Sequence, residues 1–428
     1  MILPILPLLA KDLDHSTPFL IGLCVGIYGL TQAILQIPLG MISDKIGRKP
    51  VIIGGLLVFA LGSVLAALSD NIYLIIAARA IQGSGAIAAT TMALAADLSR
   101  EDHRAKMMAF IGMSIGASFA IAMVLGPVIS RWGGLSAVFW TTALLALIGI
   151  LLVAFVVPKA ERAKTHRDVG IMKAYLKPVL TQTTLLRMNL SVFSLHLLMT
   201  ANFAVLPLIF RDSLQIDGAE HWKIYLPVLF ASIIFSLPMI IIAEKFRKTK
   251  LLFVMAVSLL ILSQFLLAFT DYTLQALVFA FLIFFIGFNF LEAMQPSLVA
   301  KYSDVSAKGT AMGVYSTSQF LGIFVGGAVG GFILQNTSVS GVFIFGIVIS
   351  IFFLLVALSL PKPDFFKSKL VKLSDEFLTD VENTTRDLLA ITGIKQAAIS
   401  AEEGVAYIKI DKLEFDQTRL DNYLKRTN

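Results

Sequence analysis

The chain has 428 residues, of which 57% are hydrophobic and only 15% are charged, and its formal net charge is +7. Soluble domains carry about 25% charged residues. The low charged fraction and the mean hydropathy of +0.83 together exclude an ordinary water-soluble protein. The Lys and Arg residues lie mostly in short loops, which indicates membrane topology rather than nucleic-acid binding. The single cysteine, Cys24, excludes an internal disulfide and has no second cysteine with which to bind a metal.

Eleven apolar segments are long enough to cross a hydrocarbon core about 30 Å thick. We expect helices at residues 18–43, 50–69, 71–97, 107–130, 136–157, 188–210, 223–243, 251–269, 273–299, 309–335 and 341–360. Residues 1–10 are also apolar but reach only about 15 Å as a helix. They lack the basic start and the small-residue cleavage site of a signal peptide. We therefore interpret them as the outer half of a truncated first helix, which brings the expected count to twelve.

Basic residues distinguish the two sides of the membrane. The loops after the second, fourth, sixth, eighth and tenth helices hold most of the Lys and Arg residues, whereas the opposite loops hold only Lys11, Arg131, Arg211 and Lys223. Because positively charged loops stay in the cytoplasm, we expect both chain ends on that side.

A long basic loop divides the membrane part into two halves. We expect an N-terminal six-helix bundle over residues 1–157, a cytoplasmic linker over 158–187 and a C-terminal six-helix bundle over 188–362. Short patterns recur about 200 residues later, with Asp44-Lys45 matched by Glu244-Lys245, and Ser99, Arg104 and Met108 matched by Ser303, Lys308 and Met312. Parallel repeats of this kind place a substrate site near the midplane between the halves.

Residues 363–428 have the composition of a soluble domain. We expect a strand at 370–372, a helix at 376–390, strands at 394–400 and 405–411, and a helix at 415–425. The order β-α-β-β-α is typical of a ferredoxin-like domain that lacks its last strand. The domain has no cysteine, so we expect no cysteine metal site. It is either a regulatory element, which contacts a cytoplasmic partner or the membrane part, or a passive tail.

The most specific pattern lies between the second and third helices, in Gly40-Met41-Ile42-Ser43-Asp44-Lys45-Ile46-Gly47-Arg48-Lys49. Its glycines allow a tight turn and a close approach of helices. Asp44 and Arg48 are spaced to pair within one turn. Asp44 is also placed to face the positive N-terminal end of another helix, such as the one that begins near Gly309. A merely basic turn explains the Lys and Arg residues but not the Gly-Asp-Gly spacing.

Two other helices carry unusual residues. The run Arg79-Ala80-Ile81-Gln82-Gly83-Ser84-Gly85-Ala86 places an arginine inside an apolar helix, where it needs water, a carboxylate or carbonyl groups unless it snorkels to the outer surface. The fifth helix contains Gly116 and Gly126-Pro127 and is followed by Gly133-Gly134. For these glycines a packing seam of small residues is the simplest interpretation.

A few polar side chains lie deep in apolar helices, and we expect them to line a cavity or to carry protons. They are Gln32 and Gln36 on the second helix, Asn189, His196 and Asn202 on the seventh, and Asn289, Glu292 and Gln295 on the tenth. The last three share one helix face. Hydrocarbon disfavours the charged form of a carboxylate, so the group can take up and release a proton, and imidazole changes charge near neutral pH. For Glu292 and His196 the alternative is a structural hydrogen bond.

The stretch Gly40–Lys49 resembles motif A of the major facilitator superfamily, G-x-x-x-D-x-x-G-R-R/K, at every defining position. The resemblance implies a latch between the two halves on the cytoplasmic side, with Asp97 as the acidic partner of Arg48. The run that begins at Arg79 resembles motif B, which implies a role of Arg79 in proton coupling. Gly126-Pro127 resembles motif C in part, which implies an antiporter.

The resemblance implies the major facilitator fold and a monomeric, proton-driven exporter of small compounds in a bacterial inner membrane. Its expected partners are lipid, protons and a small-molecule substrate, with no nucleic acid. The scarcity of deep charges favours a lipophilic substrate. No phosphate-binding G-x-x-x-x-G-K-[ST] loop is present, so ATP-driven transport is not expected, and no nucleophile–base pair indicates an enzyme. The alternative function is a transporter-like sensor that signals through its C-terminal domain.

Overall fold

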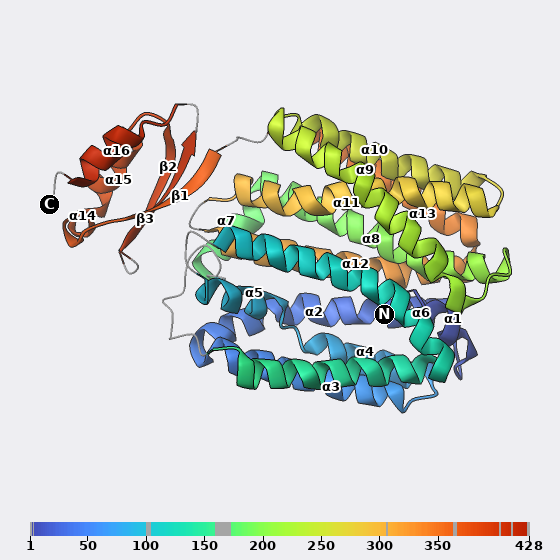
Figure 1. The fold of residues 1–428 in the computed structure, drawn as a ribbon. Helices are drawn as coiled ribbons and strands as arrows, with labels where there is room; N and C mark the ends of the chain where they lie inside the picture. The colour runs from blue at the N-terminus through green and yellow to red at the C-terminus, as the bar shows by residue number, and fades with distance from the viewer. Residues whose placement is uncertain are drawn as a thin grey trace.

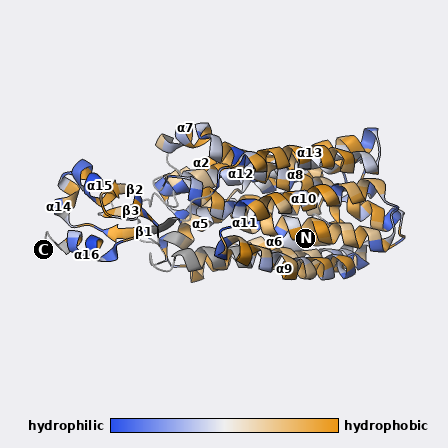
Figure 2. Ribbon diagram, turned by 90° about the horizontal axis from the view of Figure 1, so that it is seen from above, coloured by the Kyte–Doolittle hydropathy of each residue, from blue (hydrophilic) through white to orange (hydrophobic). Residues whose placement is uncertain are grey.

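The computed structural model describes residues 2, 4–99, 104–158, 173–304, 307–362, 366–401, 404–411 and 414–425. A long helical bundle carries a small α+β domain at one end (Figure 1). We call this end of the bundle the domain end and the opposite one the far end. Hydrophobic residues dominate along the bundle, and hydrophilic ones gather at its ends and on the domain (Figure 2). Ten helices among the described residues are long and apolar enough to cross a membrane.

The first half of the bundle consists of helices that run back and forth between the two ends. Its elements are α1 (Leu6–Leu9), the 3-10 turn η1 (Ala10–Asp12), α2 (Pro18–Ile46), α3 (Arg48–Ala67), α4 (Ile72–Ser84), α5 (Ala88–Asp97), α6 (Arg104–Leu151) and the π-helical turn η3 (Leu152–Val156). The Thr17 side chain accepts a hydrogen bond from the backbone N–H of Leu20 and so caps the start of α2.

Two of the expected helices are joined in α6. Inside it Gly133 and Gly134 leave helical geometry, with φ/ψ of −162°/30° and 60°/−151°. The second conformation is one that glycine adopts without strain, so the chain reverses direction at this pair. The expected helices at 107–130 and 136–157 are therefore confirmed as two spans, and dividing α6 there turns the ten spans into the eleven expected.

The segment expected at residues 71–97 is confirmed as one candidate span, Ile72–Ala95, but its helix is not continuous. The chain leaves helical geometry at Gly85, between α4 and α5. At this break α3 approaches closely, because a Cβ atom added to Gly55 would lie 3.0 Å from the carbonyl oxygen of Gly85. The hydropathy of the segment hides the break, since both helices are apolar.

The second half repeats the alternating arrangement. Its elements are α7 (Lys173–Thr181), α8 (Thr183–Asp212), the 3-10 turn η4 (Gly218–Glu220), α9 (Trp222–Lys245), α10 (Thr249–Phe269), α11 (Leu274–Tyr302), α12 (Lys308–Asn336) and α13 (Val339–Ser359). The short helix α7 and the first turn of α8 lie within the segment expected to be a linker, of which residues 159–172 are outside the described part of the chain.

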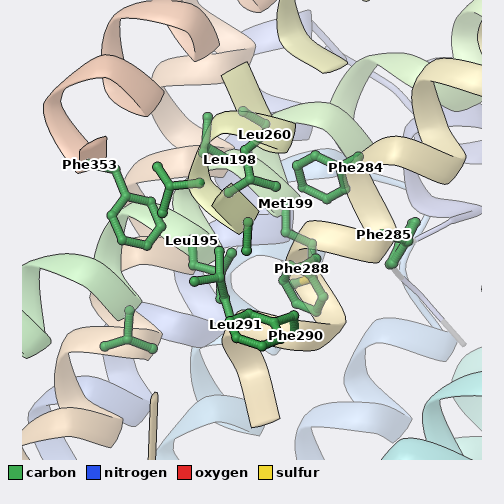
Figure 3. Packing of buried hydrophobic residues seen from close by; sticks show 14 of the residues in the cluster. Leu195, Leu198, Met199, Leu260, Phe284, Phe285, Phe288, Phe290, Leu291 and Phe353 are labelled. Carbon is green, nitrogen blue, oxygen red and sulfur yellow. The ribbon is translucent and has the colours of Figure 1, made fainter. Parts of the chain in front are cut away.

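A dense aromatic and aliphatic core fixes α8 against its neighbours. Figure 3 shows Leu195 of α8 packed among Phe288 of α11, Leu260 of α10 and Phe353 of α13. The side chains on α8 are buried around almost its whole circumference. A helix that is apolar on all sides and surrounded by others is held rigidly, so the few polar groups on α8 have fixed positions.

The C-terminal domain confirms the expected β-α-β-β-α order. It contains β1 (Phe366–Lys372), α14 (Asp375–Thr379), α15 (Val381–Leu389), β2 (Ile394–Ser400), β3 (Val405–Asp411) and α16 (Gln417–Lys425). The three strands form an antiparallel sheet in the order β1-β3-β2. The expected helix at 376–390 is divided at Asp380, whose side chain accepts a hydrogen bond from the backbone N–H of Asn383 and caps α15. The structure thus has the expected class, a helical membrane protein with a small α+β domain.

Candidate functional site

The turn from α2 to α3 gathers a buried ionic network at the domain end. Gly47 has φ of +100°, which lets the chain turn between the two helices within one residue. Arg48 then pairs through Nη1 with Oδ1 of Asp44 and donates from Nε to Oδ2 of Asp97, 3.1 Å away. Its Nη1 also donates to Oγ of Ser43 at 2.7 Å. The arginine therefore links α2, α3 and α5.

Two further residues of the pattern support this turn. The carbonyl oxygen of Gly40 accepts a hydrogen bond from Oγ of Ser43 at 2.6 Å, which orients the hydroxyl toward Arg48. The ammonium of Lys49 donates to the carbonyl oxygens of Ala154 and Val157, at 3.3 and 2.8 Å. Lys49 therefore caps the end of the helical segment that closes the first half.

The structure places the whole network inside the first half. Asp44 pairs with Arg48, and among the described residues no polar contact joins Asp44 to α12, the helix whose start near Gly309 was expected to face it. The expected partnership of Arg48 with Asp97 is present at hydrogen-bonding distance. The network is thus assembled without bridging the two halves in this conformation.

At the far end the two halves are in tight contact. Phe19 donates its backbone N–H to Oε1 of Gln335 at 3.1 Å, and Arg211 donates from Nη1 to the carbonyl oxygen of Leu8 at 3.3 Å. The ammonium of Lys11 lies 3.8 Å from Oδ2 of Asp212. These contacts join segments from opposite halves and close the far end.

Glycines allow this closure because they bring α2 and α12 together backbone to backbone. A Cβ atom added to Gly26 would lie 2.6 Å from the carbonyl oxygen of Phe324, and one added to Gly327 would lie 2.5 Å from that of Gly22. Distances this short leave no room for a side chain. The far halves of α2 and α12 therefore form a seam that requires small residues.

Arg79 is buried in the first half, with only 8% of its surface exposed. It donates from Nη1 to Oε1 of Gln82 at 2.8 Å and from Nε to the carbonyl oxygen of Cys24 at 3.4 Å, and its guanidinium carbon lies 4.7 Å from the centre of the Tyr28 ring. The alternative that it snorkels to the surface is therefore wrong. Within the described part of the chain no carboxylate pairs with it, so carbonyls and a π face stabilise its charge.

The two expected cavity residues of α2 are both buried but differ in their contacts. Gln32 donates from Nε2 to the Tyr28 hydroxyl at 2.9 Å and lines a cavity of about 320 Å³ in the first half, whereas Gln36 is buried away from it. The Oε1 atoms of both glutamines have no hydrogen-bond partner among the described residues.

Three helices of the second half bring His196 and Glu292 together. Nε2 of His196 on α8 lies 3.6 Å from Oε2 of Glu292 on α11. Nε2 of Gln319 on α12 lies 2.8 Å from the same imidazole nitrogen, and Nδ1 lies 3.2 Å from the carbonyl oxygen of Val192. Because a carbonyl only accepts, Nδ1 carries the hydrogen, and Nε2 accepts from the Gln319 amide in this arrangement.

The histidine and the glutamate differ in their access to the surroundings. His196 is buried, with its ring edge-on to Phe288 at 5.7 Å between centroids, whereas 40% of the Glu292 side chain is exposed. Glu292 lies ten residues before the end of α11, about 15 Å along the helix. An exposed carboxylate at this depth, backed by an imidazole, can take up and pass on a proton.

The other predicted polar residues surround this pair without joining it. Asn289 donates from Nδ2 to Oγ of Ser232 on α9 at 2.8 Å, and Gln295 accepts from the Tyr315 hydroxyl at 3.3 Å. The face expected to hold Asn289, Glu292 and Gln295 is therefore shared among three neighbouring helices. Asn189 and Asn202 are buried on α8, and Nδ2 of Asn202 has no hydrogen-bond partner in the described residues.

The glycines of the fifth expected helix do not form one seam. Gly126 and Pro127 are buried, whereas Gly116 is exposed and a Cβ atom added to it would meet nothing within 4 Å. The packing interpretation is therefore wrong at Gly116.

Sequence reasoning missed Gln319, because it lies in the polar run Tyr315-Ser316-Thr317-Ser318-Gln319, where one more polar residue is inconspicuous.

A family model described as Major Facilitator Superfamily matches residues 1–189 and 188–400. The chain belongs to the Major Facilitator Superfamily. Its members are transporters rather than enzymes, so the buried ionic groups belong to a transport protein that crosses the membrane several times.

Named relatives agree with this assignment. The chain is 44% identical over 426 residues to the inner membrane transport protein YajR of Escherichia coli, a match that covers all of this chain and 93% of that protein. It is 30% identical over 179 residues to the class B tetracycline resistance protein of Escherichia coli, covering 40% of this chain and 44% of that one. The crystal structure of the human organic anion transporter MFSD10 has the same fold, with a TM-score of 0.59, 19% identity and coverage of 79% of this chain and 84% of that chain.

Proposed function

We propose that this Major Facilitator Superfamily transporter couples proton movement to the export of small lipophilic compounds across a bacterial inner membrane. The observation that carries the proposal is the pair of Glu292 and His196, with 3.6 Å between Oε2 and Nε2 at mid-depth in the bundle. An ionisable pair at that depth in a membrane protein is costly and is typical of proton pathways.

The pair has two charge states that make different contacts. Without an added proton it carries one negative charge, and Nε2 of His196 accepts from Gln319. With a proton on Nε2, the imidazolium donates toward Glu292, and the pair is neutral. Gln319 must then turn its amide oxygen toward Nε2 or withdraw. When Gln319 withdraws, proton binding exchanges a contact between α8 and α12 for one between α8 and α11, which is a local change able to shift a conformational equilibrium.

The orientation in the membrane follows from the charge of the two ends. Lys45, Arg48, Lys245 and Lys250 lie at the domain end, together with the start of α12 at Lys308. We place this end in the cytoplasm because basic loops are retained there. The Escherichia coli relative is an inner membrane transport protein, which supports an inner-membrane location.

In this orientation the contacts at the far end close the outer side. We infer an inward-facing state, because in the described residues no polar contact joins Asp44 to α12 at the domain end. We propose that the Asp44–Arg48–Asp97 network engages the start of α12 when the cytoplasmic end closes, because the N-terminal end of a helix attracts a carboxylate. The two ends would then close alternately, with the glycine seam of α2 and α12 holding the inward-facing state and the ionic network holding the outward-facing one.

The substrate class follows from the scarcity of deep charges. In the described residues Glu292 is the carboxylate placed well inside a span, so the transport path offers little to a highly charged solute. Relatives named as a tetracycline resistance protein and as a triacylglyceride transporter of Mycobacteroides abscessus support an amphipathic or lipophilic substrate.

The proposal is tested by transport into proteoliposomes with an imposed pH gradient. Tetracycline and a panel of lipophilic dyes serve as probes, selected first by a growth screen of an overexpressing strain. We expect accumulation of at least one probe that collapses when a protonophore removes the gradient. Flux that is indifferent to the gradient would exclude proton coupling, and no flux of any probe together with unchanged resistance would exclude the export of such compounds.

A further inference from the structure

A lysine of the C-terminal domain is buried against the end of a transport helix. Lys409 lies on β3, the middle strand, and is 5% exposed. Its ammonium donates to the carbonyl oxygen of Lys301 at 3.0 Å and to that of Ser303 at 2.6 Å. Both carbonyls belong to the domain end of α11. The buried charge therefore has partners in a different domain from its own.

These carbonyls are well suited to a cation. The last carbonyls of a helix have no N–H partner within the helix and carry its negative dipole end. Ser303 follows α11 with an extended backbone (φ −74°, ψ 149°), so its carbonyl points away from the helix path. Lys409 thus caps α11 from another domain, as lysine side chains do at helix ends.

The sheet that carries Lys409 is placed between its own helices and the bundle (Figure 1). Ala406, Ile408 and Ile410 of β3 pack into the core beneath α15 and α16. The alternate residues Val405 and Tyr407 are buried on the other face, the face of Lys409. Burial of both faces argues against a passive tail.

The same end of α11 is a junction of several elements. Lys301 donates from Nζ to Oε1 of Glu244 on α9 at 2.7 Å. Gln182 donates from Nε2 to the carbonyl oxygen of Tyr302 at 3.1 Å, and the Tyr302 hydroxyl donates to the carbonyl oxygen of Pro361 at 2.8 Å. Movement of α11 must therefore rearrange contacts with α9, with the segment before α8 and with the domain together.

The repeat between the halves allows the end of α11 to be compared with the end of α5. The offset of 204 residues that relates Ser99 to Ser303 also relates Asp97 to Lys301. Asp97 at the end of α5 is held by Arg48 from within its own half, whereas the backbone at Lys301 is held by the C-terminal domain. The Lys301 side chain pairs with Glu244, the counterpart of Asp44, so each half has an ionic pair at this end, and in the second half the domain adds a contact to the backbone.

We propose that the C-terminal domain positions α11 through Lys409 and so sets the conformational equilibrium on which Glu292 acts. The inference rests on the proposed proton coupling for its functional consequence, but not for the docking itself. Lys409 is a positioning residue, because it touches the end of α11 and not the carboxylate ten residues away. Release of the domain frees the end of α11 and changes the ratio of inward-facing to outward-facing molecules.

The test uses the full chain with Cys24→Ala, so that introduced cysteines are the only ones available for spin labels. One label pair, at exposed Glu382 of α15 and Phe246 after α9, reports docking of the domain. A second pair, at exposed Ile46 and Phe246, reports the separation of the halves at the domain end. Distance distributions are measured by double electron–electron resonance in lipid nanodiscs between pH 5 and 8.

The variants are Lys409→Met, which keeps most of the apolar stem, and Lys409→Gln, which keeps a donor without charge. Lys395→Gln is the matched control, because Lys395 lies on the same sheet but is exposed and pairs with Glu414 inside the domain. We expect both Lys409 variants to broaden the docking distribution and to change the ratio of the two conformers about fivefold or more. The control should change neither.

Two outcomes overturn the inference. An unchanged docking distribution in both Lys409 variants would refute the contact, and a broadened distribution with an unchanged conformer ratio would refute the positioning role. If the parent protein shows no response to pH, the proposed proton coupling fails, while the ratio measured at a single pH still decides the positioning role.

Discussion

Oε2 of Glu292 on α11 and Nε2 of His196 on α8 lie 3.6 Å apart, with the amide of Gln319 on α12 at 2.8 Å from the same imidazole nitrogen. Three helices of one half thus meet at one titratable pair. Because α8 is packed by apolar side chains around most of its circumference, we expect a change in this pair to move α11 or α12 rather than α8.

Replacement of His196 tests whether the imidazole takes part in proton transfer. His196→Gln keeps hydrogen bonding but cannot change charge, so we expect transport to lose its dependence on an imposed pH gradient. His15→Asn is the control, because His15 is exposed at the far end and its φ of 62° suits asparagine. A pH profile in His196→Gln that matches the parent would assign the histidine a structural role.

The seam between α2 and α12 at the far end is tested by replacing one of its glycines with a larger residue. Gly26→Val places Cβ against the carbonyl oxygen of Phe324, so we expect the inward-facing state to be destabilised by about 1–3 kcal/mol. Spin labels at exposed Leu68 and Leu274, at the far ends of α3 and α11, should then report a longer distance. Gly54→Val, at a position on α3 with no neighbour within 4 Å of an added Cβ, should leave that distance unchanged. An equal effect of both substitutions would show that the change does not depend on the contact between α2 and α12.

The ionic network around Arg48 is tested by removing the negative charge of Asp97. Asp97→Asn leaves the Arg48 guanidinium without one of its two carboxylates in a buried site, which we expect to lower the free energy of unfolding by about 3 kcal/mol. The measurement is thermal unfolding in detergent. The matched change Glu220→Gln breaks an exposed pair with Lys223 and should cost less than about 1 kcal/mol. Indistinguishable melting curves for Asp97→Asn and the parent would show that the contact between Arg48 and Asp97 does not stabilise the fold.

Local patterns predicted the features that depend on neighbouring residues. The α2–α3 turn was predictable because its residues are close in sequence. Gly47 permits the positive φ of the turn, and Asp44 and Arg48 are spaced to pair within one helical turn. The strands at 394–400 and 405–411 were also predicted correctly, since alternation and a glycine turn define them. The same local reasoning misjudged the break at Gly85, because tight packing against Gly55 of another helix decides it.

Contacts between residues far apart in the sequence could not be predicted from such local patterns. Glu292 and His196 were each predicted as candidates, but their meeting depends on how α8 and α11 pack across 96 positions of sequence. Lys409 has the alternation of an exposed strand residue, and its burial depends on the docking of one domain on another. Hydropathy and spacing identify which residues are unusual, whereas tertiary packing determines which of them act together.

The most direct test of proton coupling measures protons and substrate in one preparation. Proteoliposomes that contain a pH-sensitive dye are given an outward gradient of a transported probe, and the parent protein is compared with Glu292→Gln. We expect the parent to move protons against the probe, with a dye response that follows probe flux. Glu292→Gln should still exchange probe for probe but give no dye response. Proton movement in Glu292→Gln equal to that of the parent would contradict the account.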